Sequence, residues 1–119
     1  MSGTTGVTTI WHNPRCSKSR QAKALLEELG VEAEVREYLK EPPTRAELEA
    51  LLAALGLEDP RAIVRTGEDA YKQLGLADAT ADELLDALVD NPILLQRPIV
   101  VRDGRAVIGR PPEDVRTLL

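Results

Sequence analysis

The sequence TIWHNPRCSKSR, residues 9–20, carries several structural signals in a short space and contains the chain's single Cys, Cys16, and its single His, His12. The β-branched and apolar residues from Val7 to Trp11 predict a first strand. The HNP sequence that follows predicts the turn that ends this strand. Beyond Cys16, apolar residues at helical spacing predict a helix that closes at a glycine: Ala22, Leu25, Leu26, Leu29 and Gly30. The stretch therefore predicts a strand, a turn, the Cys and a helix, in that order.

The segments after this helix continue to alternate between strand and helix signals. Val31, Ala33 and Val35 alternate with acidic residues and predict a second strand. We expect it to run parallel to the first, because a crossover helix joins the two. Two capping boxes then predict the starts of two further helices, each with apolar residues on one face. The boxes are Thr44 with Glu47, ahead of a helix that ends at Gly56, and Thr80 with Glu83, ahead of a helix to about Val89.

In the last third of the chain, the spacing of apolar residues changes from a helical pattern to a strand pattern. PIVVRDGRAVI, residues 98–108, places two β-rich runs around Asp103-Gly104 and predicts a hairpin. GRPPEDVRTLL, residues 109–119, has Pro at a helix opening and predicts a short terminal helix. Between about Pro60 and Leu76 we expect short helices, since two glycines interrupt the pattern. The order predicts an α/β, thioredoxin-like fold in a single domain over residues 1–119: a mixed four-stranded sheet with flanking helices and a helical insertion.

Composition narrows the function classes. No apolar run approaches the roughly 18 residues of a membrane span, so we expect no membrane association. MSGTTGVTTI lacks the basic start and long apolar middle of a signal peptide, so we expect a cytoplasmic protein. The sequence pI of about 4.9 argues against nucleic acid as a partner.

The charge is distributed unevenly along the chain. The formal net charge is -5, yet residues 11–23 carry +4 and residues 96–119 carry +2. Two cationic segments on an acidic body favour a site for a small anion, with a solvated surface face as the alternative.

Cys16 stands where a helix begins, which is a place that favours the thiolate. The helix start supplies unpaired N–H groups, and Arg15, Lys18 and Arg20 are nearby cations. The alternative is a small buried hydrophobic Cys without reactivity. A single Cys forms no internal disulfide, so any redox chemistry must use a thiol from another molecule.

Spacing excludes two familiar cysteine motifs. A phosphatase loop, C-x5-R, requires Arg where this chain has Ala22, and a dithiol motif, C-x-x-C, requires Cys where it has Ser19. A monothiol mechanism with an external reductant remains. His12 alone is more often a structural residue than a catalyst, and without a second His or Cys we expect no metal site.

Five sequence blocks resemble those of the ArsC-type arsenate reductases, most closely the short YfgD-like branch. The blocks follow the family's order and cover nearly the whole chain: HNPRCSKSR (12–20), EYLKEPPTR (37–45), RTGEDAYKQLGLA (65–77), NPILLQRPIVV (91–101) and IGRPPEDV (108–115). Nine residues follow Arg110, so we expect no long C-terminal extension.

The resemblance implies a cytoplasmic oxidoreductase of arsenic detoxification, an arsenate reductase that uses glutathione as co-substrate, glutaredoxin as partner and no bound cofactor. It implies that the nucleophile attacks arsenate to form a covalent thiol adduct, which the two external thiols then reduce to arsenite. The residues that match the family's site are the nucleophile Cys16, the oxyanion-binding Arg65, Arg97 and Arg110, the pKa-lowering His12 and the nearby hydroxyl of Ser19.

The family also implies a cis peptide bond before Pro98, beside the active Cys. Two other functions stay open from the sequence. One is a glutathione-linked monothiol oxidoreductase that acts on disulfides, against which the three extra arginines argue. The other is an Spx-like regulator that binds RNA polymerase, against which Ser19 argues, because Spx-type proteins typically carry C-x-x-C.

Overall fold

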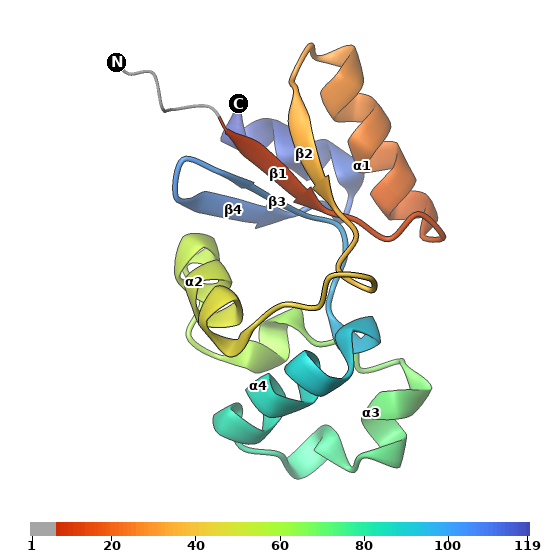
Figure 1. The fold of residues 1–119 in the computed structure, drawn as a ribbon, viewed down its shortest axis with the longest axis vertical. Coiled ribbons are helices and arrows are strands. Elements are labelled where there is room, and N and C mark those ends of the chain that lie inside the picture. The colour runs from red at the N-terminus through yellow and green to blue at the C-terminus, as the bar shows by residue number, and fades with distance from the viewer. Residues whose placement is uncertain (1–6) are drawn as a thin grey trace. The chain divides into compact units, whose positions relative to one another are not determined.

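The computed structural model describes residues 7–119, which form two compact units (Figure 1). The first, the sheet unit, consists of the described residues 7–41 together with residues 97–119. The second, the helical unit, consists of residues 42–96. The single domain expected over residues 1–119 stays a prediction.

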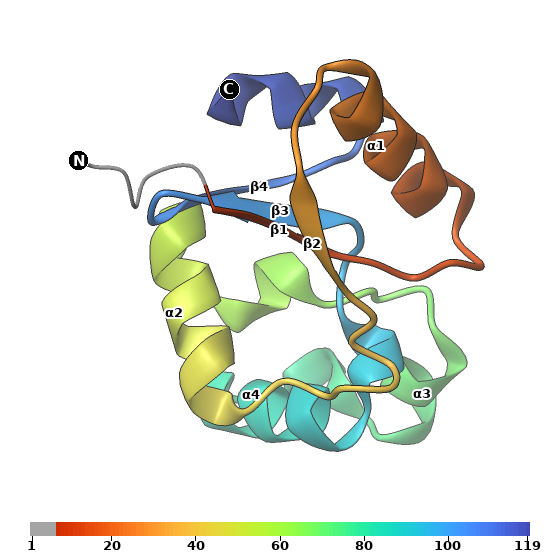
Figure 2. The same ribbon diagram turned by 45° about the horizontal axis from the view of Figure 1, so that its top comes forward.

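The sheet unit contains one sheet of four strands in the order β2-β1-β3-β4 (Figure 2). The parallel pairing of β1 with β2 confirms the crossover predicted from the sequence, and β3 is antiparallel to both of its neighbours. The mixed four-stranded sheet of a thioredoxin-like fold is thereby confirmed. The strands are β1 (Thr8–Trp11), β2 (Ala33–Arg36), β3 (Ile99–Arg102) and β4 (Arg105–Ile108).

Two helices pack on one face of this sheet: α1 (Ser17–Glu28) and a terminal 3₁₀ helix (Pro112–Leu118) (Figure 2). Burying each large apolar side chain contributes about 1.5–3 kcal/mol. The cluster between the helices and the sheet fixes where α1, and with it Cys16 at its start, lies against β1. Its buried members are Ile10, Ala22, Leu26, Val100, Val115 and Leu118.

The predicted hairpin is confirmed at Asp103-Gly104. Arg102 and Arg105 pair across it, so the connection has two residues. Both have positive φ, 52° at Asp103 and 75° at Gly104, as a type I′ turn requires. The turn matches the twist of β3 and β4 and so fixes the register of the whole hairpin.

The helical unit is built from α2 (Arg45–Leu55), α3 (Asp69–Gln73) and α4 (Ala81–Asp90). Both predicted capping boxes are present, Thr44 with Glu47 and Thr80 with Glu83. The 3₁₀ helices Pro60–Ile63 and Leu76–Asp78, with α3 between them, confirm the interrupted helical segment expected between the two boxes, and a further 3₁₀ helix, Pro92–Leu94, follows α4.

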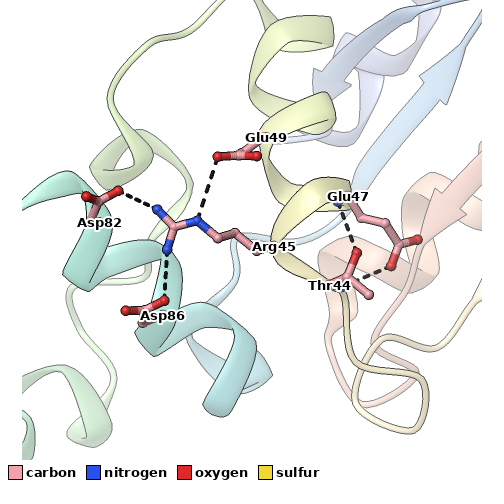
Figure 3. A network of polar contacts seen from close by, with 6 residues as sticks. All are labelled: Thr44, Arg45, Glu47, Glu49, Asp82 and Asp86. Carbon is pink, nitrogen blue, oxygen red and sulfur yellow. Dashed lines mark hydrogen bonds and ion pairs between the residues drawn. The ribbon is translucent and has the colours of Figure 1, made fainter.

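Arg45 links the start of α2 to α4 (Figure 3). Its guanidinium contacts Asp86 at 2.8 Å, Asp82 by a second nitrogen, and Glu49 at 3.7 Å. All four side chains are more than a third exposed, and exposed pairs contribute little individually. The network therefore serves mainly to select the pairing of the two helices.

The element boundaries differ slightly from those expected. Val7 is exposed and lies outside β1, and β2 begins at Ala33 rather than at Val31. The short terminal helix predicted after Arg110 is confirmed, and it is a 3₁₀ helix. Within residues 7–119, no helix is long and apolar enough to cross a membrane.

Candidate active site

Strand register brings three chain segments to one end of the sheet. Trp11 pairs with Ile99, and Ile99 pairs with Ile108. The pairing continues past the strand ends, because the Gly109 N–H donates to the Pro98 carbonyl at 2.9 Å. Arg97 immediately precedes Pro98, and Arg110 immediately follows Gly109. Their backbone segments therefore leave the sheet at the same end as the loop that carries Cys16, beyond the carboxyl end of β1.

The Cys16 loop, residues 12–16, is held by hydrogen bonds to Asn13. The Cys16 N–H donates to the Asn13 carbonyl at 3.0 Å, and the Arg15 N–H donates to Asn13 Oδ1 at 2.9 Å. Cys16 itself has an extended backbone, with φ -92° and ψ 123°, and is the N-cap residue of α1. Its carbonyl accepts the first helical hydrogen bond, from the Arg20 N–H at 3.0 Å.

The environment of Cys16 favours the thiolate. Burial raises the pKa of the Cys16 thiol, but the Ser19 N–H, Arg97 guanidinium and Lys18 N–H donors, together with the charge of Arg97, outweigh burial, so the net pKa is lowered. The Cys16 side chain makes no capping hydrogen bond to α1, so the two backbone N–H groups act on the sulfur through their partial charges. The helix start therefore stabilises the thiolate as the sequence predicted.

The cation that acts on the sulfur is Arg97, and it comes from a distant segment of the chain. Arg15 and Lys18 are exposed, and Arg20 is exposed with its guanidinium donating to the Pro14 carbonyl at 2.9 Å. Lys18 contributes its backbone N–H to the sulfur. The sequence suggested that the side chains of the neighbouring cations stabilise the Cys16 thiolate. In the structure, the buried Arg97 does so instead.

His12 and Ser19 form a buried pair behind the loop. His12 Nδ1 lies 2.6 Å from Ser19 Oγ, which also accepts the Asn13 N–H at 3.0 Å. Burial, followed by the charge of Lys23, lowers the pKa of His12, and Glu37 only partly opposes this. We therefore assign a neutral imidazole whose Nδ1 accepts the Ser19 hydroxyl proton and whose Nε2 carries hydrogen. His12 connects to the sulfur through Ser19.

Arg97 and Arg110 each precede a cis proline. The cis Arg97-Pro98 bond confirms the prediction, and the cis Arg110-Pro111 bond was not predicted. Arg97 is only 8% exposed. Nη1 of Arg110 is buried and has no hydrogen-bond partner among residues 7–119. A buried donor of this kind calls for an acceptor, and an anion at the carboxyl end of β1 would supply one.

Gly109 is a residue whose role was missed in the sequence. A Cβ at this position would lie 3.0 Å from Pro98 Cγ and 3.2 Å from Val115 Cγ1, closer than packed carbon atoms approach. Glycine therefore lets the segments that carry Arg97 and Arg110 come together. The motif IGRPPE contained this glycine, but its reason lies in a contact that only the fold creates.

Arg65 belongs to the helical unit. Its Nε lies 3.2 Å from Glu68 Oε1, and its amide N–H donates to the Leu94 carbonyl at 2.7 Å. Its grouping with Cys16 stays a prediction. Among residues 7–119, no three His, Cys, Asp or Glu side chains are gathered as metal ligands would be.

The fold and this site define a class: a thioredoxin-like protein with one activated thiol at the start of its first helix. The chain belongs to the ArsC family, whose model matches residues 11–118.

Several relatives are similar over nearly the whole chain. The protein YfgD of Escherichia coli K12 is 55% identical over 89% of this chain and 91% of its own. An arsenate reductase of Neisseria meningitidis is 49% identical over 92% of this chain and 96% of its own. The solved structure of an arsenate reductase from Vibrio cholerae has a TM-score of 0.93 at 44% identity, and the match covers 97% of this chain and 99% of that one.

Proposed function

We propose that this protein is an arsenate reductase that uses glutathione and glutaredoxin and works through a covalent bond between Cys16 and arsenic. The observation that carries the proposal is the lowered pKa of the Cys16 thiol, to which the Arg97 guanidinium contributes. The names of the Neisseria and Vibrio relatives support the substrate. A disulfide exchange enzyme has no use for a second arginine with a buried, unpartnered donor.

The arginines suit a tetrahedral oxyanion. Guanidinium groups are permanently charged and present planar, forked donors that match two oxygens at once. Arg97 would hold the thiolate and one arsenate oxygen, and Arg110 would supply its unpartnered Nη1. Arg65 is the third member of the proposed set, and its guanidinium would exchange Glu68 for the oxyanion.

In the first step the Cys16 thiolate attacks arsenic, and one arsenate oxygen takes up protons and leaves as water. The new bond joins Sγ to As(V). The neutral His12 and Ser19 hold the loop in place during this step, since Ser19 Oγ receives the Asn13 N–H and donates to His12. We assign both a role in orienting the start of α1 around the sulfur.

External thiols then supply two electrons. Glutathione adds to arsenic, and a second oxygen leaves as water. The glutaredoxin thiolate next attacks the glutathione sulfur, and the electron pair of the sulfur–arsenic bond stays on arsenic, which becomes As(III). The other product is a disulfide between glutathione and glutaredoxin. Water finally displaces Cys16 from arsenic, which frees arsenite and the thiolate. Because these reductants are kept reduced in the cytosol, we assign the activity to the cytoplasm.

The covalent step is tested by intact mass spectrometry. The protein is mixed with arsenate and glutathione in the absence of glutaredoxin, and the reaction is quenched with acid. We expect a Cys16-dependent mass increase that matches an arsenic adduct, with or without glutathione, and none in Cys16→Ser. A glutathione adduct that forms from oxidised glutathione without arsenate would favour the disulfide oxidoreductase. Retention of RNA polymerase without any adduct would favour the regulator.

A further inference from the structure

We propose that Asn13 is a positioning residue for Cys16: its side chain fixes the turn that places the sulfur at the start of α1. The inference rests on the proposed function, in which Cys16 is the nucleophile. Asn13 is 4% exposed and precedes a proline, so its backbone is restricted to extended conformations.

Asn13 makes contacts in three directions. Its N–H donates to Ser19 Oγ at 3.0 Å, and its carbonyl accepts the Cys16 N–H at 3.0 Å. Its side-chain Oδ1 accepts the Arg15 N–H at 2.9 Å, which closes an Asx turn over Pro14. Every residue type except proline, which lacks the N–H, can keep the two backbone contacts. The Asn side chain adds the turn that orients them.

The turn matters because groups from two different chain segments lower the pKa of the Cys16 thiol. The N–H groups of Ser19 and Lys18 reach it from α1, and Arg97 reaches it from the segment before β3. Asn13 follows β1 by two residues and Arg97 precedes β3 by two residues, and the paired ends of these strands are Trp11 and Ile99. A loop that relaxes at residues 13–15 would carry Cys16 away from the N–H groups, from the guanidinium, or from both.

The test removes the acceptor and then restores it. Asn13→Ala and the larger Asn13→Leu lose Oδ1, whereas the hydroxyl of Asn13→Ser can accept the same N–H. The matched control is Asn91→Ala. Asn91 is the chain's other Asn, it also precedes a proline, and its side chain donates to the Ala87 carbonyl at 3.2 Å in the helical unit. Circular dichroism selects the folded variants.

The readout is the Cys16 pKa, from thiolate absorbance and from the pH dependence of iodoacetamide alkylation, with no arsenate present. We expect Asn13→Ala and Asn13→Leu to raise the pKa by about one unit, which lowers the alkylation rate about tenfold below the pKa. Asn13→Ser should return most of the rate, and Asn91→Ala should match the unmodified protein.

An unchanged Cys16 pKa in folded Asn13→Ala or Asn13→Leu would overturn the proposal, as would a Ser variant no better than the Ala variant. If Asn13→Ala does not fold, Asn13→Leu supplies the same comparison, because it keeps most of the buried volume. The measurement is independent of arsenate reduction. A protein that shows the pKa shifts but reduces no arsenate would therefore contradict the proposed function and leave the role of Asn13 standing.

Discussion

The Arg97 guanidinium acts on the sulfur of Cys16 and lowers the pKa of its thiol. Arg97 is buried and immediately precedes cis Pro98, whereas Cys16 is partly exposed at the start of α1. The interaction joins the two chain segments of the sheet unit, since Cys16 belongs to the first and Arg97 begins the second.

Arg97→Ala should raise the Cys16 pKa, because it removes both a hydrogen bond and a positive charge. Removing one such donor to a developing oxyanion typically costs about 10²–10³ in kcat, and we expect a loss of that order. Arg97→Lys keeps the positive charge but loses the planar, forked guanidinium. We therefore expect it to affect the pKa of Cys16 less than it affects kcat. Arg102→Ala on β3 is the control. Equal effects of Arg97→Ala and Arg102→Ala would remove Arg97 from the site.

The stability of the protein should depend on pH through Cys16. The folded-state pKa lies below the ordinary value, so the unfolded chain binds more protons between the two values. The thiolate then stabilises the fold fully above the unfolded pKa, and this contribution is lost as the pH falls through the folded pKa. Denaturant unfolding of the protein and of Cys16→Ser should show a difference that grows with pH across this window. A difference that is flat in pH would contradict the lowered pKa.

His12 should be mostly neutral at pH 6.5, because burial, followed by the charge of Lys23, lowers its pKa from that ordinary value. Imidazole NMR signals should show a hydrogen on Nε2 and a midpoint below 6.5. Since the unfolded chain takes up a proton first, His12 should destabilise the fold as the pH falls below its ordinary value. Ser19→Ala should alter the NMR chemical shift of His12 Nδ1, because it removes the hydroxyl that contacts this atom. A midpoint above 6.5 would contradict the assignment.

The Arg45 network should add only modest stability. Arg45→Ala removes three exposed ion pairs, so thermal unfolding should shift by a small amount that shrinks at high salt. Leu88→Ala, in the buried face of α4, should cost about 2–5 kcal/mol at any salt concentration. A salt-independent loss in Arg45→Ala as large as that of Leu88→Ala would contradict this account.

Local signals in the sequence were sufficient for much of the fold. The two capping boxes and the Asp103-Gly104 turn depend on neighbours within a few residues, and both kinds of signal are confirmed. The placement of Cys16 at a helix start is confirmed for the same reason. The apolar stripe of α1 is confirmed at Ala22 and Leu26, which are buried, whereas Leu29 is exposed just beyond the helix. The spacing of apolar residues did not determine the length and type of short elements. The terminal 3₁₀ helix is an example, because its form depends on tertiary packing.

Several features of the site depend on contacts that local sequence does not show. Arg15, Lys18 and Arg20 are near Cys16 in sequence, yet the cation on the sulfur is Arg97. HNP predicts a turn, and two contacts of Asn13 lie within that turn, but the contact with Ser19 Oγ requires the start of α1 to lie beside it. Gly109 has no local signal at all, because the atoms that exclude a side chain belong to Pro98 and Val115.

The proposed function requires arsenate-dependent turnover that uses Cys16. The purified protein is supplied with arsenate, glutathione, glutaredoxin, glutathione reductase and NADPH, beside Cys16→Ser checked for native folding. We predict NADPH consumption that requires arsenate, glutathione, glutaredoxin and Cys16 together. Equal consumption by Cys16→Ser, or none by the folded protein with a reactive Cys16, would contradict the account.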